Sequence, residues 1–563
     1  MVLNKSESTA ASSSSIRYQD IDGKLYPHLF DYLKDIVGTD ADKYTPPEPA
    51  VDLTFLAPPV QNDAFIVRMK LAQIEFSTDR LRCYIRSHSQ SSSDIYVMRH
   101  GALHRCVDII VWPRNKEDTE AIVRAACDTN CAIIPIGGNT NVTDATSVPE
   151  FEKRCIVSLD TENMNQLLWI DKEMLTARAQ AGITGQQLEE SKHGVTLGHE
   201  PDSHEFSTLG GWISTRASGM KKNRYGNIED VLLHVTVVTP KGVLETNNLA
   251  PRVSAGPDFS QIVLGSEGMF GVVVEATFKI RPLPECQRYG SIVFHCVEDG
   301  IECFRECARQ RCYPASLRLV DNNQFIMGQK VKPKASFSEA ITRQLKLMYL
   351  SKLKGFKLTR MCAATIVFEG SKQETHAQEK GIYEIASRFN GIPAGEENGK
   401  YGYFVTFSIA YIRDFVMDYS TIGESFETSV PWPKVLLVCN KVKQYFENVH
   451  TRYGICHPAF LSFRWKNKEE LVSKPCRSVG VKPSEGYQKR PGSQQRGQVL
   501  IRRDGADMFA TAHHHQQQLR QPKSPSLSSL PKEPRYVVKP QKPGTVIITD
   551  DDFLAAQRQK ELK

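Results

Sequence analysis

Pro201-Asp-Ser-His-Glu-Phe-Ser-Thr-Leu-Gly-Gly-Trp-Ile-Ser-Thr-Arg-Ala-Ser-Gly219 is the stretch of this sequence that decides the fold. It combines a double glycine, five hydroxyl side chains near it and one arginine. Because glycine has no Cβ, Gly210 and Gly211 would let a large ligand approach the backbone closely. The hydroxyl groups can donate hydrogen bonds, and Arg216 offers a guanidinium fork that matches a phosphate group. This combination favours a cofactor site over a structural turn.

Two further glycine-rich loops adjoin strand-like segments. The apolar, β-branched run Cys131-Ala-Ile-Ile-Pro-Ile136 predicts a buried strand, and it leads into Gly137-Gly-Asn-Thr-Asn141. The backbone N–H groups of such a loop can bind a pyrophosphate, although Gly-Gly-Asn is also an ordinary turn. A third loop, Gly265-Ser-Glu-Gly-Met-Phe-Gly271, precedes a strand-like segment at 272–280. Neither the nicotinamide fingerprint nor a P-loop is found, so the three loops predict a nucleotide cofactor of another kind.

More motifs follow in a fixed order along the chain. They are Ala181-Gly-Ile-Thr-Gly185, Gly198-His-Glu-Pro-Asp-Ser203, Ser214-Thr-Arg-Ala-Ser-Gly-Met-Lys-Lys-Asn223, Tyr225-Gly-Asn-Ile-Glu-Asp230, Pro314-Ala-Ser-Leu-Arg-Leu319, Ala410-Tyr-Ile-Arg-Asp414 and Gly423-Glu-Ser-Phe-Glu-Thr-Ser429. With the three loops, this order resembles the vanillyl-alcohol oxidase/p-cresol methylhydroxylase (PCMH) superfamily. The long motifs are more similar to its alkyldihydroxyacetonephosphate synthase family, and the likeness spans roughly residues 100–463.

The resemblance implies an α+β fold with a two-subdomain PCMH-type FAD-binding domain followed by an α/β cap domain. We assign residues 1–100 to a Ser-rich N-terminal segment with a helical, Pro-rich lead-in, and 101–284 to the FAD-binding domain. Residues 285–463 form the substrate-binding cap, which is incomplete because the likeness fades at Phe463. Residues 464–563 are rich in Gln, Pro, Ser and basic residues, so we expect a disordered, low-complexity basic tail.

Periodicity and breaker residues predict the elements in more detail. In the FAD-binding domain we expect strands at 105–113, near 133, 156 and 175, and at 231–238, with helices at 117–128 and 185–194. In the cap we expect strands at 289–295, 364–368 and 403–409, and helices at 301–311, 337–349 and 375–389. A helical pattern also covers 25–37 in the lead-in.

The chemistry that the resemblance implies is an exchange without net oxidation. The family replaces the acyl chain of acyl-dihydroxyacetone phosphate by a long-chain fatty alcohol in ether-lipid (plasmalogen) biosynthesis, and noncovalent FAD supplies N5 as a nucleophile. By the same resemblance, Arg413 binds substrate and Arg318 is a catalytic residue. From the residues alone, structural ion pairs with Asp414 and Asp321 would be the simpler interpretation, and the resemblance reverses that preference.

The flavin contacts that the resemblance implies come from four short segments. They are Pro135, Ile136, Gly137, Gly138, Asn139, Thr140, Asn141, Asp202, Ser203, His204, Glu205, Phe206, Ser207, Thr208, Thr215, Arg216, Ala217, Ser218, Glu267, Gly268, Met269, Phe270, Gly271, Val272 and Val273. Asn139 and Asn141 depart from the usual Gly-Gly-Gly-Thr-Ser, but Asn tolerates left-handed backbone angles. His204 stands where Leu is usual, and we expect a neutral side chain on the outer face of the loop.

Charge and composition set outer limits. The net charge is +7, but residues 471–563 carry 17 Lys and Arg against 8 Asp and Glu, so the other 470 residues sum to −2. The basic character therefore belongs to the tail, and we expect no nucleic-acid partner. No run of about 18 apolar residues predicts a membrane-spanning helix, and no secretory signal is seen. Fourteen cysteines without C-x-x-C pairs indicate reduced intracellular thiols and no metal site.

After Phe463 the family's catalytic tyrosine and Gly-rich His-His-His loop are not recognisable. His513-His-His515 lacks the glycines of that loop, so we expect weak or absent turnover by this chain. An FAD-dependent 2-hydroxy-acid dehydrogenase or oxidase and a non-catalytic flavin-binding protein remain open as alternatives. The resemblance implies a peroxisomal homodimer at the membrane surface, although the terminal Glu-Leu-Lys563 is not a peroxisomal tripeptide.

Overall fold

The structure is a computed structural model that describes Tyr32, Lys34, Asp35 and residues 53–479 with short gaps. The gaps are 100–102, 190–192, 246–249, 251–253, 255, 333–336, 408–411, 414–415, 418–421, 426, 454–458 and 466–469. The three described residues of the predicted helix at 25–37 are helical. Residues 480–563 lie outside the described part of the chain. The predictions for this part of the tail, including those for His513–515, therefore concern residues that the structure does not describe.

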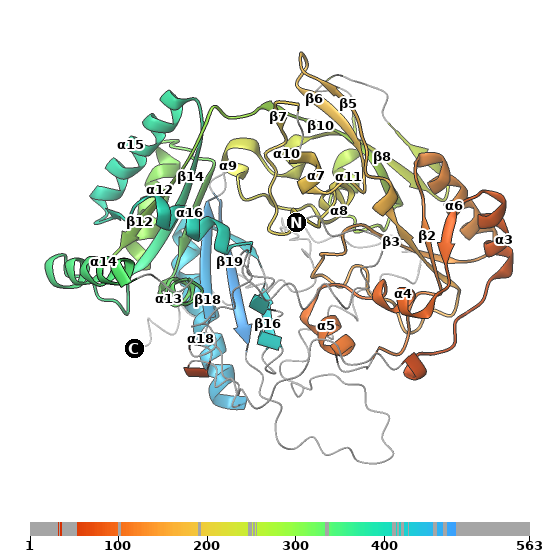
Figure 1. The fold of residues 1–563 in the computed structure, drawn as a ribbon, viewed down its shortest axis with the longest axis horizontal. Coiled ribbons are helices and arrows are strands. Elements are labelled where there is room, and N and C mark those ends of the chain that lie inside the picture. Colours follow the sequence, from red (N-terminus) through yellow and green to blue (C-terminus); the bar gives the residue numbers. More distant parts are fainter. Residues whose placement is uncertain are drawn as a thin grey trace, which may run out of the picture. The chain divides into compact units, whose positions relative to one another are not determined.

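The first subdomain is built on a four-stranded sheet in the order β1-β2-β4-β3 (Figure 1). The strands are β1 (Glu75–Ser77), β2 (Ile109–Trp112), β4 (Ile156–Asp160) and β3 (Ala132–Ile136). β2, β4 and β3 are parallel, as expected for the wholly buried run of β4. The amphipathic helix α6 (Lys116–Asp128) connects β2 to β3 and buries Ile122 and Ala126 on the sheet.

The lead-in contributes directly to this subdomain. β1 pairs antiparallel with β2, and helix α3 (Asp63–Leu71) inserts Phe65 and Met69 into the same apolar cluster. Both side chains are essentially inaccessible to solvent. The segment before residue 101 therefore supplies part of the core of the FAD-binding domain. From the sequence, we had predicted that this domain consists of residues 101–284 alone.

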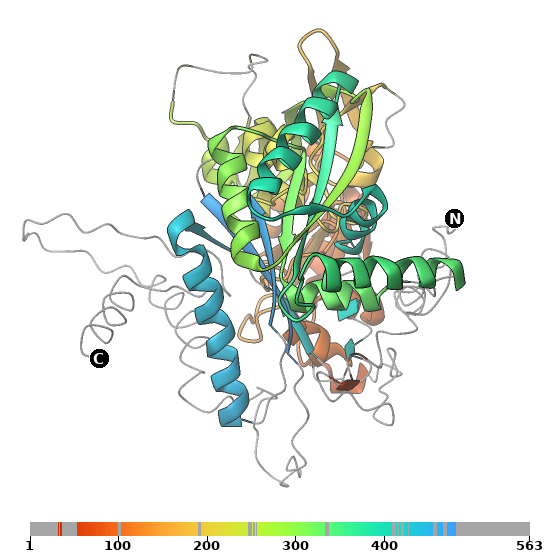
Figure 2. The ribbon, with the colours of Figure 1, turned by 90° about the vertical axis from the view of Figure 1, so that its left-hand side faces the viewer.

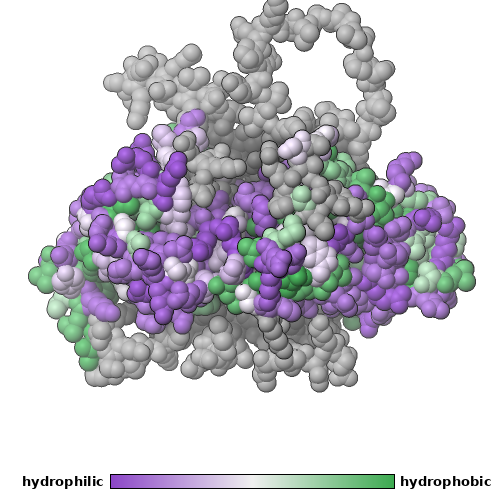
Figure 3. Space-filling view, turned by 90° about the horizontal axis from the view of Figure 1, so that it is seen from above, coloured by the Kyte–Doolittle hydropathy of each residue, from purple (hydrophilic) through white to green (hydrophobic). Residues whose placement is uncertain are grey.

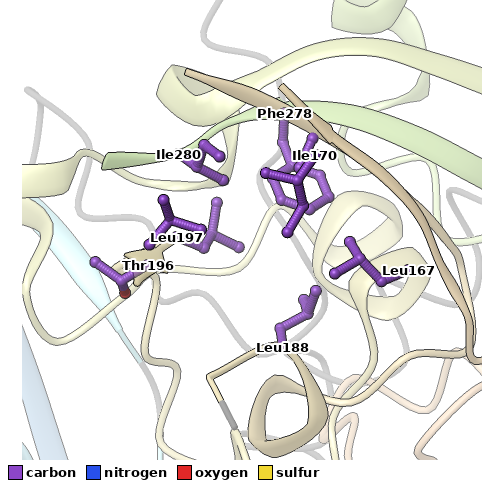
Figure 4. Close-up of a pocket in the computed structure, with 9 residues that line it drawn as sticks. Leu167, Ile170, Leu188, Thr196, Leu197, Phe278 and Ile280 are labelled. Carbon is purple, nitrogen blue, oxygen red and sulfur yellow. The ribbon is translucent and has the colours of Figure 1, made fainter. Parts of the chain in front are cut away.

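The second subdomain is a five-stranded antiparallel sheet. Its order is β5 (Leu167–Asp171), β6 (Thr176–Gln180), β10 (Val272–Lys279), β8 (Leu232–Thr239) and β9 (Gly242–Leu244). Helix α8 (Leu209–Thr215) packs on β10 and buries Trp212 and Ile213. Beside it, a small apolar cavity is lined by Leu188, Leu197 and Phe278 (Figure 4). Its volume of about 20 Å³ suits a packing defect better than a ligand.

The cap is a mixed-length sheet of eight strands in the order β15-β12-β14-β13-β18-β19-β16, with β17 paired to β19. The strands are β12 (Cys286–Phe294), β13 (Ser316–Val320), β14 (Cys362–Gly370), β15 (Ile392–Pro393), β16 (Ile422–Ser425), β17 (Thr428–Pro431), β18 (Ala459–Trp465) and β19 (Glu470–Val479). Helices α12 (Val297–Arg309) and α15 (Lys372–Arg388) cover one face, where Phe294, Leu319 and Phe368 form the core (Figures 1 and 2).

The cap sheet extends beyond residue 463, where the sequence analysis ended it. β18 runs to Trp465, and β19 continues the antiparallel pairing from Glu470 to Val479. The low-complexity tail that we expected from residue 464 therefore begins with a strand. The composition did not indicate this strand, because polar and basic residues outnumber the apolar Leu471, Val472 and Val479 in it.

The strand that we predicted at 403–409 is wrong. Residues up to 405 form helix α16 (Glu396–Val405), which packs on the face of the cap sheet opposite α15. The alternation of aromatic residues suggested a strand, but Gly399, Gly402 and Tyr403 follow the helical spacing and contact β12 and β14. The helix lies close to the sheet because its two glycines carry no side chain.

The other predicted elements of the described part are present with shifted ends. The helices of the predictions correspond to α6, α7 (Gly185–Glu189), α12, α14 (Phe337–Met348) and α15. Many elements were not predicted, among them β5, β13, α13 (Asn322–Lys330), α18 (Val435–Tyr453), the helices α3, α8 and α16, and the strands β1 and β15 to β19. The shorter elements are η2 (Leu53–Phe55), α4 (Arg80–Ile85), α5 (Ser92–Arg99), η3 (Thr161–Asn163), β7 (Val195–Thr196), α9 (Lys222–Tyr225), α10 (Ile228–Val231), α11 (Ser260–Val263), β11 (Arg281–Pro282), η4 (Tyr349–Leu353) and η5 (Trp432–Lys434).

The contact between α16 and β12 gives a testable prediction. A Cβ at Gly399 would lie 2.2 Å from the carbonyl oxygen of Gly290, so Gly399→Ala must displace the helix. We expect this variant to lower the free energy of unfolding by about 2 kcal/mol or more in urea denaturation. Gly328→Ala is the matched control, because no atom lies within 4 Å of its Cβ and alanine favours helix α13. Equal stability of the two variants would contradict the packing.

Candidate flavin and substrate site

The first two predicted flavin loops touch each other through their backbones. A Cβ at Gly138 would lie 1.9 Å from the carbonyl oxygen of Phe206, and one at Gly137 would lie 2.3 Å from Thr208 Oγ1. Real Cβ atoms do not approach other atoms so closely. At Gly138 the obstacle is backbone, so only glycine fits there, whereas at Gly137 the Thr208 side chain would have to shift. The loop after β3 and the loop before α8 therefore form one continuous surface.

The third predicted loop joins the same surface. The N–H of Gly265 donates to Ile213 O at 3.0 Å, and the N–H of Glu267 donates to Ser214 O at 2.9 Å. The Glu267 carboxylate accepts a hydrogen bond from Thr143 Oγ1 at 3.1 Å. These bonds connect the loop at 265–268 to the end of α8 and to the first loop, so the structure brings all three predicted loops together.

Three non-glycine residues of these loops have left-handed backbone angles. Asn139, Arg216 and Glu267 have φ values of 51°, 50° and 50°. The expectation for Asn139 is thereby confirmed. Each such residue costs of the order of 1–2 kcal/mol and is typical of functional sites, where the surrounding packing holds it in place.

The first loop has the features of an anion site. Residues 137–141 are half-buried, and within the described part of the chain their backbone N–H groups donate no hydrogen bond. Buried N–H groups normally have partners, so these donors suit a phosphate ligand. Nearby, Phe206, Met269 and Phe270 are 42%, 82% and 49% exposed, which leaves apolar surface for a ring system. The residues present therefore fit FAD.

Some of the remaining residues predicted to contact the flavin also stabilise the fold. Thr208 caps α8 by accepting from the N–H of Gly211, and Arg216 pairs with Glu229 at 3.7 Å. Val272 and Val273 begin β10 with their side chains in the core, so only their backbone can face a ligand. The others lie at the predicted places in the loops: Asp202, Ser203 and Glu205 in the turn before α8, Ser207 at its end, and Thr215, Ala217 and Ser218 at the end of α8.

Two interpretations of the deciding stretch need correction. The His204 ring is half-buried and lies edge-on to Phe407 of the cap, with ring centroids 5.4 Å apart, so it is not on an outer face. Gly210 is buried in α8, where an added Cβ would lie 2.8 Å from Ala181 Cβ. This glycine permits close packing of the helix on the neighbouring chain and not the approach of a ligand.

Arg318 lies on β13 and is only 5% exposed. Its Nη1 donates to Thr406 Oγ1 after the end of α16, on the side of the sheet away from α12 and α15. Asp321, its possible partner from the sequence, caps α13 and pairs with Lys443 at 2.7 Å. Arg318 is thus a buried cation on the α16 side of the cap sheet.

Arg413 lies in a short described segment of the cap. Its Nη1 donates to Gln90 O at 2.6 Å, and its Nη2 donates to Gln90 Oε1 at 3.3 Å. Asp414, the alternative ion-pair partner, lies outside the described residues. The N–H of Gln90 donates to Asn141 O at 2.7 Å, so this arginine is connected to the first flavin loop by one residue.

A buried charged cluster joins the FAD-binding domain to the cap. Lys221 pairs with Glu200 and, at 2.8 Å, with Glu369 of β14. Glu369 also accepts from Tyr225 Oη at 2.7 Å, and Glu200 accepts from Tyr403 Oη. Burial alone would lower the pKa of Lys221, but the charges of both carboxylates outweigh it and raise that pKa. Burial and Glu200 likewise raise the pKa of Tyr403, so the cluster keeps these protons at neutral pH.

One further contributor to the site, which was not predicted, is the run Ser87-His-Ser-Gln-Ser-Ser-Ser-Asp94. No motif was identified in this run, yet His88 O accepts from Asn139 Nδ2 at 2.8 Å. The one local signal was the spacing of Ser91 and Asp94, which form the start of α5. Among the described residues, no cluster of His, Cys, Asp or Glu side chains has the composition to hold a metal ion.

The contact of the two loops predicts that Gly138→Ala binds flavin more weakly. The added Cβ would collide with Phe206 O, so the loop must move away from the surface that it forms with the second loop. We expect the variant to bind FAD with a Kd at least tenfold higher than the wild type, a loss of about 1.4 kcal/mol or more, measured by titrating FAD into the apoprotein and following the flavin absorbance near 450 nm. Gly328→Ala should keep the wild-type Kd, and an unchanged Kd in Gly138→Ala would contradict this assignment.

The charged cluster predicts a large loss of stability in Lys221→Met. Two carboxylates would then remain in a buried site without their cation, which costs about 3–5 kcal/mol in the free energy of unfolding. Lys372→Met, which removes an exposed pair with Glu285, should change it by less than about 0.5 kcal/mol. Because the pKa of Lys221 is raised, its stabilisation is complete below about pH 10 and is lost only as the pH rises further. If the stability difference between the wild type and Lys221→Met already shrank as the pH rose through neutral, this assignment would be contradicted.

Comparisons with known proteins agree with the geometry. Residues 107–247 match the family model "FAD binding domain", and residues 283–458 match "FAD linked oxidases, C-terminal domain".

Alkyldihydroxyacetonephosphate synthase from Caenorhabditis elegans is 47% identical over 79% of this chain and 75% of the relative. The synthase from Trypanosoma brucei brucei is 31% identical over 78% of this chain and 73% of the relative. A solved alkyldihydroxyacetonephosphate synthase superposes with a TM-score of 0.74 at 29% identity, covering 81% of this chain and 83% of the other. p-Cresol methylhydroxylase shares the fold, with a TM-score of 0.55 at 13% identity over 74% and 82%. The chain belongs to the alkyldihydroxyacetonephosphate synthase family of FAD-dependent enzymes.

Proposed function

We propose that this chain binds acyl-dihydroxyacetone phosphate and a long-chain fatty alcohol, and exchanges the acyl group for the alkyl group to form the ether bond. The names of its relatives support the reaction, and the observation that carries the proposal is the half-buried first flavin loop, in which the N–H groups of 137–141 donate no hydrogen bond to the described residues. Bound FAD would supply the nucleophile for the exchange. The protein itself must hold a phosphate, release a carboxylate and move a proton.

The two arginines are suited to the anionic groups of this substrate. We propose that Arg413 binds the phosphate, because a guanidinium matches its oxygens in charge and geometry. Arg318 is buried, so its charge acts in a medium of low dielectric constant and would stabilise the departing fatty-acid carboxylate strongly. The four segments predicted to contact FAD keep that assignment here, with residues 137–141 at the pyrophosphate.

The packing also supports revised domain bounds. We propose that the FAD-binding domain begins near residue 53, because α3 and β1 complete its first subdomain. The cap then begins near residue 283, where the second family model starts, and includes β18 and β19 up to Val479. The lead-in and the tail of the original assignment both become shorter.

We further propose a peroxisomal homodimer at the membrane surface, as the family resemblance implies. No helix in the described part of the chain is long and apolar enough to cross a membrane. However, Ile341, Leu345 and Leu353 on α14 and η4 are 47%, 55% and 76% exposed, and residues 341–360 contain six Lys and Arg but no acidic residue. Figure 3 shows apolar surface at the edge where α14 lies in Figure 1. This segment has the composition of an interfacial anchor for anionic lipid.

The activity is tested with the purified 563-residue chain loaded with FAD. Incubation with acyl-dihydroxyacetone phosphate and labelled hexadecanol should yield labelled alkyl-dihydroxyacetone phosphate, measured after lipid extraction. The expectation of weak turnover, based on the unrecognised tyrosine and histidine loop, stays a prediction that the same assay measures. Reduction of the flavin by D-lactate would instead favour the 2-hydroxy-acid dehydrogenase, and flavin binding without either reaction would favour the non-catalytic protein.

Arg318→Lys gives the corresponding prediction for the site. Lysine keeps the charge but loses the planar fork, so we expect a decrease in kcat of about 100-fold, in the range seen for one lost oxyanion donor. Arg309→Lys is the matched control, because Arg309 is exposed on α12 and pairs with its neighbour Glu306 on the same helix. An unchanged kcat in Arg318→Lys would show that the buried guanidinium is structural.

A further inference from the structure

The serine-rich run 87–94 is largely buried, with Ser93 as its exposed member. Ser87, Ser89, Ser91 and Ser92 are between 0% and 5% exposed, although serine is usually a surface residue. Each hydroxyl group has a partner: Ser87 Oγ donates to Cys83 O, Ser89 Oγ donates to Asp144, and Ser91 Oγ contacts Ser93. A run of this composition stays buried only because its polar groups are satisfied within the protein.

On one side, this run holds the first flavin loop. His88 O accepts from Asn139 Nδ2 at 2.8 Å and from Thr146 Oγ1 at 3.4 Å. The N–H of Gln90 donates to Asn141 O at 2.7 Å. The loop that carries the predicted pyrophosphate site therefore has its shape fixed from outside by residues 88–90.

On the other side, the same run holds the cap. Gln90 accepts two hydrogen bonds from Arg413, one at its backbone oxygen and one at Oε1. Two positions later, Ser92 Oγ donates to Gly423 O of β16 at 2.6 Å in a buried contact. Gln90 thus contacts both the flavin loop and the arginine assigned to the substrate phosphate.

We propose that Gln90 is a positioning residue for substrate binding, which fixes the guanidinium of Arg413 relative to the first flavin loop. This inference rests on the proposed function, in which Arg413 binds the phosphate. An arginine side chain has many rotamers, and holding one of them in advance lowers the entropy cost of binding. Two acceptors on one residue, itself bonded to Asn141, restrict the guanidinium in both position and plane.

The side-chain amide of Gln90 is also a suitable group for positioning Arg413. A carboxylate at position 90 would orient the guanidinium equally well, but its charge would compete with the substrate phosphate for the same cation. A neutral amide oxygen accepts the hydrogen bond without placing a further negative charge beside the ligand. Gln90→Glu should therefore impair binding of the phosphate more than Gln90→Leu, which only removes the side-chain acceptor.

The test measures binding and does not depend on turnover. Hexadecyl-dihydroxyacetone phosphate is titrated into FAD-loaded protein by calorimetry. We expect Kd to rise about fivefold in Gln90→Leu, as one hydrogen bond to a charged group predicts, and about 50-fold in Gln90→Glu. The Kd for hexadecanol, which has no phosphate, should stay unchanged in both variants. Gln261→Glu is the matched control, since Gln261 is exposed on α11 and should bind as the wild type does.

Three outcomes would overturn the inference. If the wild type binds the alkyl phosphate and both Gln90 variants bind it equally well, Gln90 positions nothing, and the proposed function stands. If the variants lose FAD, or weaken hexadecanol binding to the same extent, the residue has a general structural role. If the wild type itself binds no alkyl phosphate, the phosphate role of Arg413 fails, and the proposed function and the inference are both rejected.

Discussion

The site depends on a contact in which no side chain takes part. The backbone at Gly138 lies so close to the carbonyl group of Phe206 that a single methyl group would separate the two loops. Because of this contact, the strand that ends at Ile136 and the helix that starts at Leu209 are fixed relative to each other. The cofactor surface is therefore the junction of two chain segments that lie about 70 residues apart in sequence, and neither loop can form it alone.

The charged cluster around Lys221 shows that the sequence region around the flavin stretch also binds the cap. Glu200 and Lys221 flank the flavin stretch in sequence, yet both are directed to the cap, where they meet Glu369 and Tyr403. The same short region thus holds the cofactor in its middle and the substrate domain at its ends. Buried ion pairs contribute little net stability but penalise any arrangement that separates the partners, so the cluster gives the junction a defined geometry.

The flavin loops could be predicted from the sequence because the residues that indicate them lie close together in the chain. Glycines, hydroxyl groups and a neighbouring buried strand lie within a few residues of one another, and the structure confirms that they meet. The helix α16 was misread because the aromatic alternation at 401–405 fits a strand, and the close approach to Gly290 that favours the helix involves a distant segment. The run 87–94 was missed for the same reason, since its serines are buried only through partners such as Asp144 and Gly423. Its composition alone resembles a solvated segment.

The left-handed residues Asn139, Arg216 and Glu267 have a consequence for the life of the protein in the cell. Each holds conformational free energy that a relaxed loop would release, and all three lie on the surface that the cofactor is expected to cover. A ligand that binds only the folded chain adds to its stability by mass action, in proportion to the logarithm of its concentration. The population of folded protein would then depend on the supply of flavin.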